Sequence, residues 1–197
     1  MMLTYNGYRQ KAQTGDMIGF SGTGIASTAI KVSTRSEWSH IGMTILAAEW
    51  DALLCWEATL MCNVPDIESG FIKKGVMLVP LETRIHTYNG KVGIRRIRKP
   101  LTVEQLIILR AFRHEVKGRP YEKDYIELIK SAYDGPFGLN TQDLMSLFCS
   151  ELFAEPCIRM ELIDNRLPSN EYTPGDFLDD GNFDEIWEPV KEIVVSV

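Results

Sequence analysis

Cys149 is the residue best suited to act as a nucleophile in this sequence. It follows a polar stretch at residues 140–143 and precedes Leu152 and Phe153, which are typical of the buried side of a helix. We therefore expect a helix that begins at or just before Cys149. In the first turn of a helix, unpaired backbone N–H groups and the positive end of the dipole favour a thiolate. A lone cysteine is more commonly a small buried apolar residue, so the remaining sequence must decide.

A catalytic cysteine needs an imidazole to take its proton and return it to the leaving group, and a polar partner must orient that imidazole. The chain has three histidines. His86 and His114 fall in a linker and on a helix, where we expect surface or structural roles. His40 begins an expected strand and Glu57 lies on the next one, so Cys149, His40 and Glu57 form a candidate Cys–His–carboxylate set. The candidate substrate-binding residues are their neighbours Trp38, Ser39 and Ser150.

Whether His40 and Glu57 meet depends on the loop of a β-hairpin. Apolar residues alternate with other types after His40, as in a half-buried strand, and residues 53–58 return as the second strand. If the loop has an even number of residues, Glu57 falls on the same face as His40, directly opposite or one diagonal step away. An odd loop separates them. With an even loop, the positions expected to share the core face are Ile41, Met43, Leu54 and Trp56.

The rest of the chain predicts one α+β domain covering residues 1–197. Further strands are expected at 17–20, 75–80, 91–97 and 192–197, and further helices at 25–32, 102–118 and 122–132. Residues 81–85 are expected to form a short helical or irregular linker. Pro156 should end or kink the Cys149 helix early. The basic run of Arg95, Arg96, Arg98 and Lys99 is expected on an exposed strand face or edge, with anion binding as the alternative. The acidic residues from Asp179 to Glu188 are expected on a solvated surface.

Composition narrows the class of protein. A chain of 197 residues with 45% hydrophobic residues can form a proper core, and a net charge of −6 argues against nucleic acid as the main partner. The four cysteines form no CxxC pair, so we expect free thiols in a reducing compartment, no metal site and no cofactor. The start of the sequence has no apolar signal core or lipid-anchor motif, and no run is long enough to span a bilayer. We therefore expect a soluble cytoplasmic protein.

Four short motifs together resemble a known family. They are Gly15–Phe20, the Trp-Ser-His-Ile-Gly segment at 38–42 with Glu57-Ala58 after it, the Cys-Ser-Glu-Leu segment at 149–152, and 172–177. In this order, with the histidine before the cysteine, they resemble the circularly permuted NlpC-type papain-like hydrolases of the YiiX/YaeF-like amidase group. This group is related to the lecithin retinol acyltransferases.

The resemblance implies a permuted papain-like fold, in which an antiparallel sheet or partial barrel carries His40 and packs against helices. It implies Cys149 at a helix N-terminus as nucleophile, His40 as general base and acid, Glu57 as orienting residue, and the Cys149 N–H as an oxyanion donor. The implied activity is hydrolysis of an amide or ester in a peptidoglycan-type peptide or a lipid-like acyl substrate. Two alternatives remain open: acyl transfer on the same fold, and an inactive module that binds a peptide or lipid.

Overall fold

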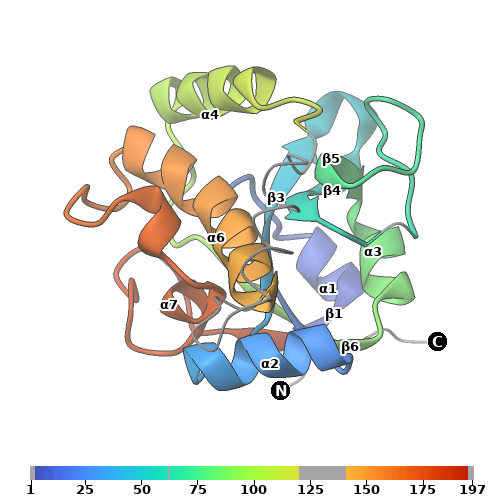
Figure 1. The fold of residues 1–197 in the computed structure, drawn as a ribbon. Helices are drawn as coiled ribbons and strands as arrows, with labels where there is room; N and C mark the ends of the chain where they lie inside the picture. Colours follow the sequence, from blue (N-terminus) through green and yellow to red (C-terminus); the bar gives the residue numbers. More distant parts are fainter. Residues whose placement is uncertain (1–2, 62, 120–140, 195–197) are drawn as a thin grey trace.

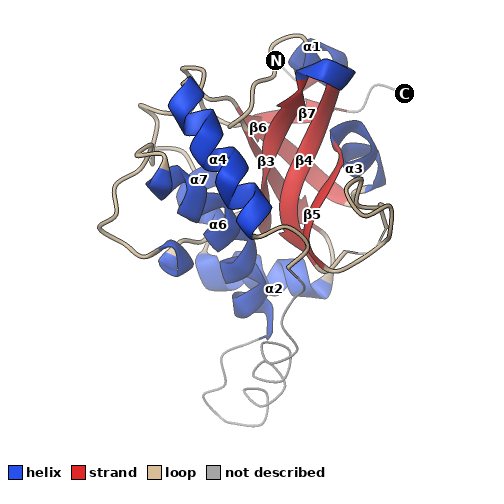
Figure 2. Cartoon of the chain, turned by 90° about the horizontal axis from the view of Figure 1, so that it is seen from above, coloured by secondary structure: helices blue, strands red, loops and turns tan. Residues whose placement is uncertain are grey.

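The computed structural model describes residues 3–61, 63–119 and 141–194. A sheet of seven strands lies at its centre, with helices packed around it (Figures 1 and 2). The strand order is β1-β7-β6-β2-β3-β4-β5, and all neighbours pair antiparallel except β1 and β7. The strands are β1 (Leu3–Thr4), β2 (Met17–Gly22), β3 (His40–Ala47), β4 (Ala52–Thr59), β5 (Gly75–Pro80), β6 (Gly90–Arg95) and β7 (Lys191–Val194).

Helices cover both faces of this sheet, so the expected α+β class is confirmed. They are α1 (Tyr5–Arg9), α2 (Ile25–Thr34), α3 (Leu81–Thr87), α4 (Val103–Glu115), α6 (Thr141–Arg159) and α7 (Pro174–Leu178). Figure 2 shows α4, α6 and α7 on one side of the sheet and α3 on the other. The helix expected at 122–132 lies outside the described residues. None of the helices in the described ranges combines the length and apolar character that crossing a bilayer requires.

Two apolar cores result from the alternation of side chains along the strands. The first core joins β3, β4 and β5 to α4, α6 and α7, and it contains Ile41, Met43, Leu54 and Trp56 as expected. The second core joins the opposite face of the sheet to α1 and α3, and its members include Phe20, Cys55, Leu81 and Ile85. The two faces of β3 and β4 therefore pack against different helices.

The β3–β4 hairpin has the even loop that the candidate site requires. Ala47 pairs with Ala52, which leaves the four residues 48–51 as the connection, and Met43 pairs with Trp56. Continuing this register places Glu57 opposite Gly42, one diagonal step from His40 on the same face. Of the two loop parities that the sequence left open, the structure has the even one.

The nucleophile helix differs from the expectation. Helix α6 begins at Thr141, so Cys149 is its ninth residue and lies in the helix interior. There a backbone N–H bonds to the carbonyl four residues earlier, so the helix-start effect and the expected oxyanion donor at Cys149 are not available. The polar residues 141–143 are the first residues of α6. Pro156 does not end the helix either, because α6 continues through it to Arg159.

The basic run also differs from the expectation at Arg95. This side chain is fully buried at the end of β6, where its guanidinium donates to the carbonyls of Phe177, Asn182 and Glu188 and pairs with Asp184. Four polar contacts to the C-terminal segment compensate the burial of this charge, because an isolated buried charge would be strongly destabilising.

Candidate active site

His40 and Glu57 form a short, shielded pair at one end of the β3–β4 hairpin. His40 Nε2 lies 2.6 Å from Glu57 Oε2, and the side chains are 14% and 0% exposed. The pair exists because the four-residue loop sets the register and because Gly42, opposite Glu57, has no side chain. A Cβ at Gly42 would lie 2.9 Å from Cys55 Sγ and 3.4 Å from Glu57 Cβ. The bond to Nε2 leaves Nδ1 as the ring nitrogen available for another partner.

Arg84 completes the environment of Glu57, and the sequence analysis did not identify it. Its Nε lies 2.6 Å from Glu57 Oε1, and both side chains are fully buried. Arg84 also donates to Asn63 Oδ1 at 2.7 Å. The sequence did contain a signal, because Leu81, Arg84 and Ile85 have the spacing of one face of a helix. A helix over residues 81–87 with this face buried would have placed Arg84 in the interior.

These two partners hold Glu57 in its charged form. Burial by itself raises the pKa of Glu57, but the hydrogen bond from His40 and the charge of Arg84 outweigh burial and lower the pKa below its usual value. A charged, oriented carboxylate at Glu57 fixes the imidazole of His40 in one orientation.

Cys149 reaches His40 from helix α6. The Cys149 side chain is buried at 1% exposure against Ile41, Met43 and Trp56, and it is hydrogen-bonded to His40. Burial by itself lowers the pKa of His40, but the contacts with Cys149 and Glu57 outweigh burial and raise it from 6.5 to about 9. A pKa of about 9 favours the imidazolium form of His40 at neutral pH.

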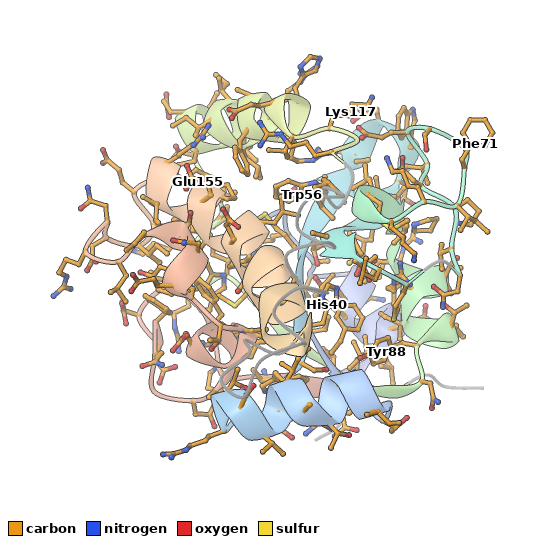
Figure 3. The ribbon with its side chains drawn as sticks, in the orientation of Figure 1. His40, Trp56, Phe71, Tyr88, Lys117 and Glu155 are labelled. Atoms are coloured by element: carbon orange, nitrogen blue, oxygen red, sulfur yellow. The ribbon has the colours of Figure 1, made fainter. Side chains whose placement is uncertain are left out.

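Aromatic side chains hold the other side of the His40 ring. Phe20, which pairs with His40 across β2 and β3, lies 5.3 Å from it between ring centroids, and Tyr88 lies 4.8 Å from Phe20. Tyr88 also hydrogen-bonds Ser39 and Ser27. Figure 3 shows His40 beside α6, with Tyr88 between it and α2. This packing restricts the motion of the imidazole.

The three candidate substrate-binding side chains all lie in the protein interior. Trp38 packs in the first core, where a Cβ at Gly93 would lie 2.4 Å from its ring. Ser39 Oγ donates to the carbonyl of Phe20 and accepts from the N–H of Gly22. Ser150 Oγ donates to the carbonyl of Tyr172. The contacts that the structure gives these residues are with the protein itself, and they tie the site to β2 and to the C-terminal segment.

The site therefore combines a thiol, an imidazolium and a buried carboxylate–guanidinium pair within a mixed α+β protein. Among solved structures, this chain is similar to the crystal structure of metalloprotein yiiX from Escherichia coli O157:H7, with 19% sequence identity and a TM-score of 0.51. The alignment covers 93% of this chain and 97% of that chain. No protein-family model matches this sequence, and no curated protein matches it. The chain thus has a yiiX-like fold, and a likeness at this identity establishes the fold alone.

The name of that neighbour raises the question of a metal. Within residues 3–61, 63–119 and 141–194, no three or more His, Cys, Asp or Glu side chains converge as metal ligands. At the candidate site both carboxylate oxygens of Glu57 are engaged, one by His40 and one by Arg84. The positive charge of Arg84 also opposes a second cation. The described residues at this site do not fit a metal centre.

Proposed function

We propose that this protein is a thiol hydrolase that cleaves an amide or ester bond through an acyl-enzyme intermediate. The observation that carries the proposal is the meeting of Cys149 from α6, His40 from β3 and Glu57 from β4, with Arg84 behind them. Among the described cysteines, Cys149 is the one bonded to an imidazole, whereas burial raises the pKa of both Cys55 and Cys157. The residue set and its order support a relation to the permuted NlpC-type papain-like hydrolases.

In the first half-reaction, the Cys149 thiolate attacks the carbonyl carbon and forms a C–S bond. The imidazolium of His40 gives its proton to the leaving nitrogen or oxygen as the scissile bond breaks. The products are a thioester on Cys149, a neutral His40 and the free amine or alcohol. The charged Glu57 holds the imidazole in place throughout.

In the second half-reaction, neutral His40 takes a proton from water, and the resulting hydroxide attacks the thioester carbonyl. The C–S bond breaks, the acid is released, and the thiolate–imidazolium pair returns. If another nucleophile replaces water, the same steps give acyl transfer. The substrate classes proposed are peptidoglycan-type peptides and lipid-like acyl compounds.

A binding module without turnover is the competing function, and one observation favours it. Cys149 is only 1% exposed, and its backbone N–H lies inside α6 instead of at a helix start. A module of this kind would keep the fold and use its surface for a peptide or lipid. Its cysteine would react no faster than any other buried thiol.

Thiol labelling separates these functions. We expect iodoacetamide at pH 7 to label Cys149 faster than Cys55 and Cys157, because Cys149 is the one of these three that contacts His40. Peptide mapping by mass spectrometry measures each rate, and His40→Ala should abolish the difference. Equal labelling of the three cysteines would contradict the hydrolase proposal and favour the binding module.

Turnover tests assign the roles. We expect Cys149→Ala to abolish product formation from peptidoglycan fragments or acyl lipids, read by mass, while circular dichroism shows a retained fold. Glu57→Gln should weaken turnover less than His40→Ala does, because it removes orientation and not the proton carrier. A His40→Ala protein as active as the parent would overturn the mechanism.

A further inference from the structure

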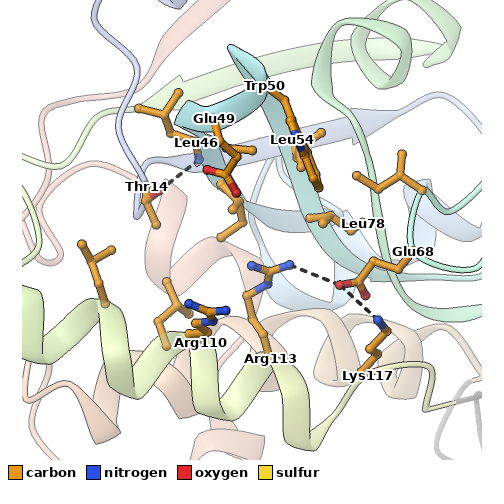
Figure 4. A pocket seen from close by; sticks show the side chains of 15 residues that line it. Thr14, Leu46, Glu49, Trp50, Leu54, Glu68, Leu78, Arg110, Arg113 and Lys117 are labelled. Atoms are coloured by element: carbon orange, nitrogen blue, oxygen red, sulfur yellow. Dashed lines mark hydrogen bonds and ion pairs between the residues drawn. The ribbon is translucent and has the colours of Figure 1, made fainter.

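A pocket that does not include Cys149 lies between α4 and the loop end of the β3–β4 hairpin (Figure 4). It has a volume of about 540 Å³, which is within the range of small-molecule sites. Its apolar lining comes from the first core, and the proposed mechanism uses none of it. The apolar lining residues include Ile45, Leu54, Leu78 and Leu109.

One wall of this pocket carries three cations, Arg110 and Arg113 on α4 and Lys117 just beyond its end, with only two acidic side chains in the lining. Figure 4 shows Arg113 and Lys117 both reaching Glu68, each at a long 3.7 Å from the same oxygen, Oε1. Arg110 makes no hydrogen bond or ion pair with any described residue. Glu49 is the other acidic residue in the lining, so the pocket has a positive balance in a chain of net charge −6.

Arg113 is a largely buried cation whose hydrogen-bond donors are only partly satisfied. Its side chain is 20% exposed, and its buried Nε has no hydrogen-bond acceptor in the described part of the chain. Burial lowers the pKa of Arg113, and the neighbouring Arg110 lowers it further, against the opposing effect of Glu68. A half-satisfied guanidinium facing a cavity is completed by an anion, because carboxylates and phosphates match its donors.

The opposite wall is made by Trp50, which is 71% exposed although it lines an apolar pocket. Aromatic side chains left open in this way commonly contact ligands or membranes. Trp50 and the apolar lining residues Leu54 and Leu78 together provide apolar surface next to the cations.

We propose that this pocket binds an amphipathic anion, with a carboxylate or phosphate head on Arg110 and Arg113 and an aliphatic tail between Trp50 and Leu54. Neither part alone explains the site. A purely polar anion would leave the apolar lining exposed to water, and a neutral lipid would leave the guanidinium groups of Arg110 and Arg113 without a counter-charge. The proposal stands independently of the chemistry at Cys149.

Tryptophan fluorescence and calorimetry test this binding directly. The other three tryptophans, Trp38, Trp56 and Trp187, are buried, so a fluorescence change on titration reports mainly on Trp50. We expect monomeric laurate and dodecyl phosphate to shift the emission and release heat. Dodecanol and dodecyltrimethylammonium should bind at least about tenfold more weakly, because they cannot pair with the guanidinium groups.

The key variant is Arg110→Gln, which should weaken laurate binding about tenfold without loss of thermal stability, because the side chain is exposed and has no described partner. Arg166→Gln removes the same charge from a side chain that is 86% exposed and outside the pocket, and it should leave affinity unchanged. Trp50→Phe should remove the fluorescence signal and keep the heat of binding.

Three outcomes would overturn the proposal. They are no binding of either anion, equal affinity for dodecanol and laurate, and equal affinity of Arg110→Gln and the parent. Vesicles of phosphatidylglycerol separate a lipid surface from a free ligand. If the protein binds these vesicles but no monomeric amphiphile, the cations serve a membrane contact and the pocket proposal fails. Activity at Cys149 does not enter these measurements, so either proposal can fail alone.

Discussion

Arg84 is the residue whose effect on the site is easiest to isolate. Its guanidinium is the counter-charge that allows Glu57 to stay ionised in a fully buried position. Removing one partner of a buried pair leaves the other charge without compensation, which costs far more than the pair itself contributes.

We expect Arg84→Met to destabilise the protein by about 3–5 kcal/mol and to slow Cys149 labelling. The double variant Glu57→Gln/Arg84→Met should be more stable than Arg84→Met alone, because the orphaned carboxylate is gone. Urea denaturation followed by tryptophan fluorescence measures both. An Arg84→Met protein as stable as the parent would show that the pair does not hold the charge on Glu57.

The pKa of His40 predicts a dependence of stability on pH. Its folded value of about 9 exceeds the ordinary 6.5, so the folded protein holds more protons between these values. The resulting stability, on the order of 3 kcal/mol, is fully present below pH 6.5 and lost as pH rises through 9.

Cys149→Ala should flatten this dependence, because Cys149 is the leading interaction that raises the pKa of His40. The free energy of unfolding, measured from pH 6 to pH 9.5 in both proteins, gives the comparison. The same slope in Cys149→Ala and the parent would mean that the thiol does not interact with the imidazole in solution.

At the scale of elements, the β3–β4 hairpin aligns the carboxylate and the imidazole. Its four-residue loop fixes the register, and Gly42 gives β4 a close approach at the level of Glu57. A methyl group at Gly42 would meet Cys55 Sγ at 2.9 Å and the backbone oxygen of Trp56 at 3.1 Å. Backbone atoms cannot give way as a flexible side chain can.

We expect Gly42→Ala to destabilise the protein by about 1–3 kcal/mol and to reduce the selectivity of Cys149 labelling, because the strands must separate where the His40–Glu57 bond forms. Gly24→Ala is the matched control, since a Cβ there meets nothing within 4 Å. Thermal unfolding and the labelling rate are the measurements. Similar effects of the two substitutions would mean that the close approach at Gly42 does not control the site.

At the scale of the whole molecule, Arg95 joins the C-terminal segment to the sheet. The guanidinium at the end of β6 donates to carbonyl groups within residues 177–188, and α6 shares the first core with this segment. We propose that residues 1–197 fold as one unit, with Cys149 and His40 brought together only in the complete fold.

We expect Arg95→Met to destabilise the protein by about 3–5 kcal/mol, since several buried carbonyl groups lose a charged donor. Lys99→Met, at an exposed position nearby in sequence, should change stability little. Parent denaturation should give one coincident transition by fluorescence and far-UV circular dichroism. Two separated transitions would contradict folding as one unit.

The sequence by itself determined the features that depend on local pattern. Alternating apolar residues predicted β3 and β4, and Thr102 and Gln105 have the spacing of the capping box that begins α4. These succeed because side-chain periodicity and hydrogen bonding over a few residues are set by neighbours in the chain.

Only the tertiary structure decided the start of α6, the burial of Arg84 and Arg95, and the contact between Cys149 and His40. Each depends on which face of a helix or strand finds a partner far away in sequence, and a charged residue becomes buried only when that partner supplies the compensating charge or carbonyl groups. The sequence named Cys149, His40 and Glu57 as candidates. The packing of α6 against β3, together with α3 behind β4, decided that they meet.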